Sequence, residues 1–251
     1  MIANLKVGAG GEAALEAAEK EMIATVKTSE PLEYSSERRR LETFGVAIVV
    51  ILAAMNVTRV AFTIHEHCAV PWPWLAVLGG WITADFVSGF VHWLGDTWGR
   101  EDWPFFGTSL IRGFREHHSD PMAITRHDFV EASGSISLAL VPVLLVALLA
   151  PRQAMRGGSA VIFLTIFSIA MLLTNEIHKS AHREKVCRPV AWLQHAGLIL
   201  SPEHHAAHHA KPFDRCYCIS AGWLNPLLDA IGFFRTLERC VTFITGSEPH
   251  S

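Results

Sequence analysis

Charged residues are scarce in this sequence. Asp, Glu, Lys and Arg together make up 18% of its 251 residues, and the formal net charge is -3. Such a balance provides no basic footprint for nucleic acid, so no nucleic-acid partner is expected. The first 35 residues are rich in Ala and Glu and contain no apolar stretch of the signal-peptide kind. The sequence therefore points away from a nucleic-acid-binding protein.

Two further patterns are missing. The five cysteines form no even framework of disulfide pairs, and we expect structural or free thiols at Cys68, Cys187, Cys216, Cys218 and Cys240. The chain also lacks the HExxH arrangement in which two histidines and a glutamate on one helix serve a zinc hydrolase. No tandem repeat is present. A disulfide scaffold, a zinc protease and a repeat protein are all disfavoured.

Four long apolar runs with almost no charge are present instead. Runs of about eighteen such residues suit a bilayer better than the core of a water-soluble bundle, which is the alternative. We predict an all-α integral membrane protein with four spans, at about Leu41–Ile64, Trp74–Leu94, Ser133–Ala150 and Ala160–Ile177. Pro142 would kink the third span without excluding it. Residues 1–40 are expected to form a cytosolic arm and residues 41–251 a membrane domain.

The cations predict the orientation of the spans. Arg38, Arg39 and Arg40 precede the first span, and further Lys and Arg residues follow the second and the fourth. Four spans bring all three segments to one side, which the positive-inside rule assigns to the cytosol, although the loop between spans three and four also carries Arg152 and Arg156. All clustered histidines then lie on this side. His65 and His67 fall on the other.

Histidine is the residue type that carries the chemistry. Ten of the fourteen histidines lie in tight groups, and neutral imidazole is a common ligand for iron, copper and zinc. Helical positions four apart point the same way, so three of the groups can each direct two ligands at one centre. The predicted metal ligands are His92, His117, His118, His127, His178, His182, His204, His205, His208 and His209. His195 lies in an apolar stretch and is expected to be a core or interface residue.

This number of ligands exceeds what one metal ion uses, because a catalytic zinc typically takes three protein ligands. Two metal ions are therefore implied. A pair of irons that activates dioxygen for attack on an unactivated carbon-hydrogen bond is the natural candidate, while copper and zinc remain open. Asp96 is a candidate catalytic residue, either as a ligand or by orienting His92 or a metal-bound water.

Five segments carry a family resemblance over residues 80–240. They are DFVSGFVHWLGDTWG from Asp85, FREHHSDPMAITRHDFVE from Phe114, NEIHKSAH from Asn175, PEHHAAHH from Pro202 and GWLNPLLDAIGFFRTLE from Gly222. With these segments the chain resembles the plasmanylethanolamine desaturases, the Kua-type membrane desaturases. Family members often have Trp where this chain has Ser180, a difference that removes no ligand.

The resemblance implies an oxygen-dependent desaturase that converts the 1-O-alkyl chain of an ether phospholipid into the 1-O-alk-1'-enyl chain of a plasmalogen. It also implies two iron ions and electrons from cytochrome b5 and its reductase. The implied location is the endoplasmic reticulum in a eukaryote or the inner membrane in a bacterium. We expect the alkyl chain to occupy a slot between spans two and four. Candidates for the lipid phosphate are Arg112, Arg115, Arg126 and Lys211.

Other functions remain open at this point. A lipid hydroxylase or an acyl-lipid desaturase would use the same kind of centre. A zinc-dependent membrane hydrolase is disfavoured by the excess of ligands, and a metal carrier or sensor has no use for a lipid-facing slot.

Overall fold

The structure is a computed structural model that describes residues 35–67, 73–104, 107–151 and 159–250. Every regular element in these ranges is helical, which confirms the all-α prediction. Most of the predicted N-terminal arm, residues 1–34, and Cys68 lie outside the described residues. The arm boundary at residue 40 stays a prediction. The elements in chain order are α2 (Ser36–His67), α3 (Pro73–Thr97), the π-helix η1 (Gly107–Ile111), α4 (Arg112–Ser119), the 3₁₀ turn η2 (Ala123–Arg126), α5 (Phe129–Leu149), α7 (Ser159–His182), α8 (Arg188–His195), α9 (Pro202–His208), α10 (Asn225–Ala230) and α11 (Phe233–Thr245).

Four of these helices, α2, α3, α5 and α7, are long and apolar enough to cross a membrane, as predicted. Large apolar side chains on them face outward: Phe44 is 63% exposed and Val146 64%. In water such exposure would be costly, whereas lipid accepts it, so the soluble-bundle alternative is disfavoured. Both α3 and α7 extend past the predicted span ends, to Thr97 and His182. Their last turns therefore hold histidines on rigid helix.

The core lies between the four long helices. Their apolar faces meet in one cluster, which comprises Val49, Leu52, Ala53, Ala84, Leu140, Leu144, Ala170, Met171 and Leu172. Pro142 lies inside α5, as predicted. Arg59, the one basic residue late in the first apolar run, donates to the carbonyls of Ala147 and Leu148 at the end of α5. These carbonyls have no partner within their own helix, so the arginine is satisfied inside the bundle.

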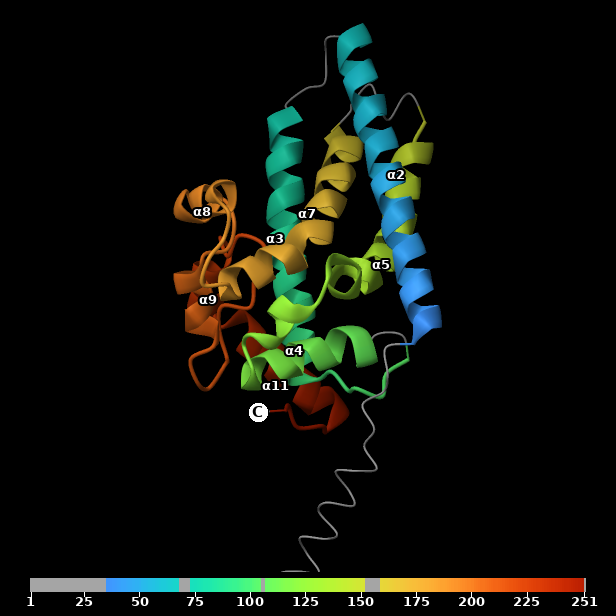
Figure 1. The fold of residues 1–251 in the computed structure, drawn as a ribbon. Helices are drawn as coiled ribbons and strands as arrows, with labels where there is room; N and C mark the ends of the chain where they lie inside the picture. Colours follow the sequence, from blue (N-terminus) through green and yellow to red (C-terminus); the bar gives the residue numbers. More distant parts are fainter. Residues whose placement is uncertain (1–34, 68–72, 105–106, 152–158, 251) are drawn as a thin grey trace, which may run out of the picture. The chain divides into compact units, whose positions relative to one another are not determined.

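The shorter helices gather at one end of the bundle. Figure 1 shows α4, α9 and α11 beyond the C-terminal ends of α3 and α7, and the start of α2 lies at the same end. The other end of α2, with the backbone of His65 and His67, points away from them. The side chains of these two histidines lie outside the described residues. The backbone thus brings the clustered histidines to one end of the four helices.

The cysteines of the described ranges are free thiols, in agreement with the prediction. They are Cys187, Cys216, Cys218 and Cys240. None belongs to a group of side chains that is suited to holding a metal ion.

Candidate metal centre

Eight of the ten predicted histidines converge in two adjoining groups. The first, here called the all-histidine group, consists of His117, His178, His182, His205 and His209. The second contains His92, His117, His118 and His208, and Asp96 lies against it. We call this second set, with Asp96, the aspartate group. His117 belongs to both groups, so the two form one continuous centre.

Helical spacing builds the all-histidine group. His178 and His182 are one turn apart on α7, and their Nε2 atoms are 3.3 Å apart. His205 and His209 repeat the arrangement around α9, with 3.0 Å between their Nε2 atoms. Helix α9 begins sharply, because Ser201 caps the backbone N-H of His204 and Pro202 occupies the first turn.

The nitrogen-nitrogen distances in this group fit a metal site. The Nε2 atom of His205 lies 2.8 Å from the Nε2 atoms of both His178 and His182. A neutral ring nitrogen carries at most one hydrogen and cannot satisfy three such contacts at once. Metal-nitrogen bonds of about 2.0–2.1 Å would place neighbouring ligand nitrogens about 2.9–3.4 Å apart. These nitrogens therefore stand close to the spacing of ligands around one ion.

The aspartate group is oriented by backbone carbonyls. His92 donates from Nδ1 to the carbonyl of Tyr217 at 3.1 Å, and His208 donates from Nδ1 to that of Arg215 at 2.8 Å. In a neutral ring this directs the lone pair of Nε2 inward. Both Nε2 atoms then face Asp96 Oδ2, at 3.2 and 3.5 Å. Acceptor facing acceptor in a buried site is unfavourable, and a cation between them resolves it.

Burial keeps rings of the centre neutral. Removal from water lowers the pKa of His117 and of His205 well below the ordinary histidine value, and neighbouring histidines lower both further. The pKa of His209 falls to about 3, again chiefly through burial. A ligand must be deprotonated to bind metal, so these rings are ready to do so at neutral pH. The described residues thus suit a metal pair both in geometry and in protonation.

A buried carboxylate in α3 anchors the loop that supplies the orienting carbonyls. Asp85 is fully buried, and its Oδ1 accepts from the backbone N-H groups of Ala221 and Gly222, each at 2.8 Å. One turn on, Ser88 Oγ accepts from the N-H of Ile219. The loop packs so closely that a Cβ on Gly89 would approach the backbone nitrogen of Cys218 to 2.9 Å. From the sequence, Asp85 was recognisable only as a charged residue inside a predicted span. Its partners are backbone N-H groups, which the residue types do not reveal.

Two predicted ligands are not brought into either group. His127 pairs through Nδ1 with Glu131 at 2.9 Å, on the first turn of α5. His204, in the first turn of α9, turns away and contacts Asn225, with its Nε2 3.0 Å from the side-chain nitrogen. Gly222, at a φ of +73°, leaves room for that ring. His195 belongs to neither group, as expected; it is exposed at the end of α8, which rules out the core position and leaves the interface position as a prediction.

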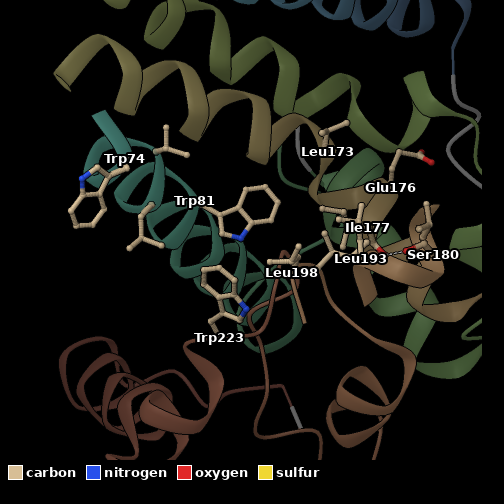
Figure 2. Close-up of a pocket in the computed structure, with 13 residues that line it drawn as sticks. Trp74, Trp81, Leu173, Glu176, Ile177, Ser180, Leu193, Leu198 and Trp223 are labelled. Carbon is tan, nitrogen blue, oxygen red and sulfur yellow. Dashed lines mark hydrogen bonds between the residues drawn. The ribbon is translucent and has the colours of Figure 1, made fainter. Parts of the chain in front are cut away.

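An apolar pocket of about 630 Å³ lies between α3 and α7, where the sequence predicts a slot between spans two and four. Figure 2 shows its tryptophans and, toward Ser180, the side chains of Ile177 and Leu193. The lining residues are Trp74, Val77, Leu78, Trp81, Leu173, Glu176, Ile177, Ser180, Val190, Leu193, Leu198, Ile199 and Trp223. We call this the α3–α7 pocket.

The α3–α7 pocket connects to the metal centre through packed side chains. Ile177 and Ile199 line the pocket and also belong to an apolar cluster with Phe114. The ring of Phe114 stacks on that of His92, with centroids 4.9 Å apart. A chain in the pocket would therefore be one layer of side chains away from the histidines.

Comparison with known proteins places these features in context. Residues 81–251 match the model of the lipid desaturase domain family. The chain is 43% identical over 217 residues to plasmanylethanolamine desaturase of Myxococcus xanthus, covering 86% of this chain and 76% of the relative. It is 40% identical to plasmanylethanolamine desaturase 1 of Mus musculus (87% and 82% covered) and 35% identical to the chloroplastic fatty acid desaturase 4 of Arabidopsis thaliana (71% and 54% covered). No solved structure matches the chain.

Proposed function

Because the chain belongs to the lipid desaturase family, we propose that it introduces the 1'-alkenyl (vinyl ether) double bond into the 1-O-alkyl chain of an ether phospholipid. The named substrate of its relatives from Myxococcus xanthus and Mus musculus is plasmanylethanolamine, and both align with more than four fifths of this chain. The product would be the corresponding plasmenylethanolamine, a plasmalogen. The chain is an integral membrane protein with four candidate spans, and a phospholipid substrate would reach it within the same bilayer.

The main support for this proposal is that the apolar α3–α7 pocket lies close to the histidine centre at one end of the spans. The stretch from Trp74 to Trp81 alone covers about 10 Å along α3, enough to line several carbons of an alkyl chain. At the other end of the pocket, Ile177 leads toward Phe114 and His92. An alkyl chain in this pocket would have its first carbons next to the layer of Ile177 and Phe114, beyond which His92 lies.

We propose that the centre holds two iron ions. The all-histidine group would hold one, and the aspartate group the other, with His117 available to either. When bound, such a pair supplies the oxidising power with which dioxygen takes two hydrogens from neighbouring carbons. Buried His92 and His117 support this assignment, because the Nε2 atom of each ring has no hydrogen-bond partner within the described ranges.

The protein's own share in the reaction is positioning and exclusion of water. Phe114 and Ile177 cover the inner end of the pocket with apolar surface, so the reacting carbons would be held away from solvent. The carbonyls of Tyr217 and Arg215 keep the rings of His92 and His208 in one tautomer and one orientation. Asp96 lies 3.2 Å from the Nε2 atoms of both His92 and His118, where it would bind a metal ion or orient its ligands.

The partners and the location are part of the same proposal. Electrons would come from cytochrome b5 and its reductase, and the centre would face the cytosol. The enzyme would reside in the endoplasmic reticulum of a eukaryote or in the inner membrane of a bacterium. The cations before α2 and after α3 and α7 support the cytosolic orientation of the histidine end.

The test is conversion of 1-O-alkyl phosphatidylethanolamine to its vinyl ether form in membranes that contain the protein, a reductase chain and oxygen. We expect vinyl ether lipid with the native chain and none with His182→Ala, at equal amounts of inserted protein. A pocket variant, Trp81→Ala, should keep its metal and raise the KM for the lipid.

Three results would contradict the proposal. Altered acyl unsaturation with unchanged vinyl ether lipid would indicate an acyl-lipid desaturase. A hydroxylated ether chain would indicate a hydroxylase. Two zinc ions and no iron after anaerobic purification would favour a hydrolase.

A further inference from the structure

A second pocket, of about 590 Å³, lies against the aspartate group. Asp96 and His118 form part of its wall, and the other lining residues are Thr97, Arg115, Pro212, Phe213, Asp214, Tyr217, Glu238, Pro249 and His250. It shares no lining residue with the α3–α7 pocket, and its lining is the more polar of the two, with Asp96, Arg115 and Glu238 among its residues. The metal centre thus has an apolar pocket one layer of side chains away and a more polar pocket directly against it, which we call the polar pocket.

Arg115 on α4 is the cation of this polar pocket. The Nη2 atom of its guanidinium is buried, and it has no hydrogen-bond partner in the part of the chain that the structure describes. A buried guanidinium nitrogen without an acceptor is unfavourable, and a phosphate can accept two parallel hydrogen bonds from arginine. By contrast Arg126, another predicted phosphate ligand, already pairs with Asp120 at 2.7 Å. Arg112 and Lys211 do not line the pocket.

Glu238 on α11 is the matching anion. Its Oε1 accepts from Trp93 Nε1 at 3.0 Å, which fixes the carboxylate and leaves Oε2 for another donor. Phe213 and Tyr217 also line the pocket, and aromatic rings attract ammonium groups. Two other carboxylates line the pocket: Asp214 is already paired with Arg235, and Asp96 faces His92 and His118.

The position of the reacting bond explains why a polar pocket is needed here. In an ether lipid the C1'-C2' bond is adjacent to the ether oxygen, so glycerol and headgroup lie only a few bonds from the metals. A lipid desaturated in the middle of its chain would need no polar pocket at this distance. The pocket against Asp96 and His118 offers space for such a headgroup close to the metals.

We propose that the polar pocket binds the phosphoethanolamine headgroup, with the phosphate on Arg115 and the ammonium on Glu238. This inference rests on the proposed function and deepens it, because it assigns headgroup selection to two residues outside the metal centre. Arg115 recognises the phosphate of any glycerophospholipid. Glu238, with the aromatic faces, recognises the amine.

The test compares three ether lipids on the full-length, metal-loaded protein: 1-O-alkyl phosphatidylethanolamine, 1-O-alkyl phosphatidic acid and 1-O-alkyl-2-acylglycerol. We expect Arg115→Met to raise the KM for the two phospholipids about 10- to 100-fold and to leave that for the acylglycerol unchanged. Glu238→Gln should raise only the KM for phosphatidylethanolamine. In both variants kcat and metal content should be retained. The control is Arg239→Met, an exposed arginine next to Glu238 that does not line the pocket.

Binding of a soluble short-chain 1-O-alkyl glycerophosphoethanolamine, measured by calorimetry, separates the two proposals. If the native chain binds the probe, Arg115→Met weakens binding, and no vinyl ether forms, the proposed function fails and the headgroup site stands. If vinyl ether forms and Arg115→Met changes neither binding nor KM, the headgroup site is wrong. A fall in kcat that is equal for all three lipids would also overturn it, because that would indicate a path for oxygen or electrons.

Discussion

The two halves of the metal centre are held in different ways. In the all-histidine group, two pairs of rings each come from one helical turn, and the Nδ1 atoms of His178 and His205 have no hydrogen-bond partner among the described residues. In the aspartate group, His92 and His208 are tied through Nδ1 to the carbonyls of residues 217 and 215. One half is positioned by local helix geometry, the other by a distant loop.

The two groups therefore depend on different parts of the structure: one needs only the helices that carry its histidines, and the other also needs the loop that orients them. The all-histidine group depends on α7 and α9 being present and packed, and it tolerates changes elsewhere. The aspartate group depends also on Asp85 and Ser88, which hold the loop of residues 217–224 on α3. Substitutions therefore should affect the two proposed metal ions unequally.

The largest effect is expected from a ligand of the all-histidine group. His205→Ala removes the ring that contacts three others, so activity should fall more than about 100-fold, beyond the loss typical of a residue that only orients a ligand. Vinyl ether formation and bound metal are the measurements. The neighbouring His204→Ala, whose ring contacts Asn225, should lose less than tenfold, about the lower limit for an orienting residue. Equal losses would show that α9 offers both rings to the metals. His65→Ala, at the far end of α2, should be nearly silent.

Asp96 tests the other half. Asp96→Asn keeps the shape of the side chain but removes the charge that faces His92 and His118, and we expect a loss of about 10- to 100-fold with one metal ion bound less tightly. Competition with a chelator should release about half of the metal first. Uniform release of both ions would contradict the division into two unequally held halves.

A smaller effect is expected when the anchor rather than a ligand is changed. Asp85→Asn keeps one acceptor oxygen for the loop and should cost roughly tenfold in activity, whereas Asp85→Ala removes both and should cost more. The spectrum of a metal in the aspartate group should change and that of the all-histidine group should not. If Asp85→Ala retains activity and an unchanged spectrum, the loop does not orient these ligands.

Acid should weaken the metal-free protein, in part through the all-histidine group. The pKa of His209 is about 3 in the folded chain and 6.5 in the unfolded chain. Between these two pH values the ring is protonated only when the chain unfolds, so acid favours unfolding. The ring contributes no pH dependence above 6.5, and stability falls as the pH drops from there toward 3. His209→Gln should therefore reduce the loss of thermal stability between pH 7.5 and 5.5. If His209→Gln loses as much thermal stability as the native chain over this pH range, the pKa of His209 is not lowered in the folded protein.

The sequence predicted what local geometry determines. The four spans follow from apolar length, and pairs such as His178 and His182 follow from helical spacing. The same spacing also suggested that His204 and His208 share a target, but only His208 does. His204 lies in the first turn of α9, where Asn225 and the space over Gly222 accept its ring instead.

Long-range contacts of backbone atoms could not be predicted. Nothing in the residue types of Arg215 and Tyr217 indicates that their carbonyls orient two histidines. The site of Arg115 is similar, because only the fold brings α4, the loop at Phe213 and α11 around one pocket. Asp85 was the one available signal, since a carboxylate within a membrane span is costly without partners.

The partners of Asp85 also set an order of events during biosynthesis. Their N-H groups come from residues 136 to 139 positions later in the chain. While α3, α5 and α7 insert into the membrane, the carboxylate of Asp85 still lacks these hydrogen bonds. They can form only after residues 221–224 have been translated. A segment translated after all four candidate spans therefore completes the packing inside the second span, and a protein truncated before residue 221 would be a substrate for membrane quality control.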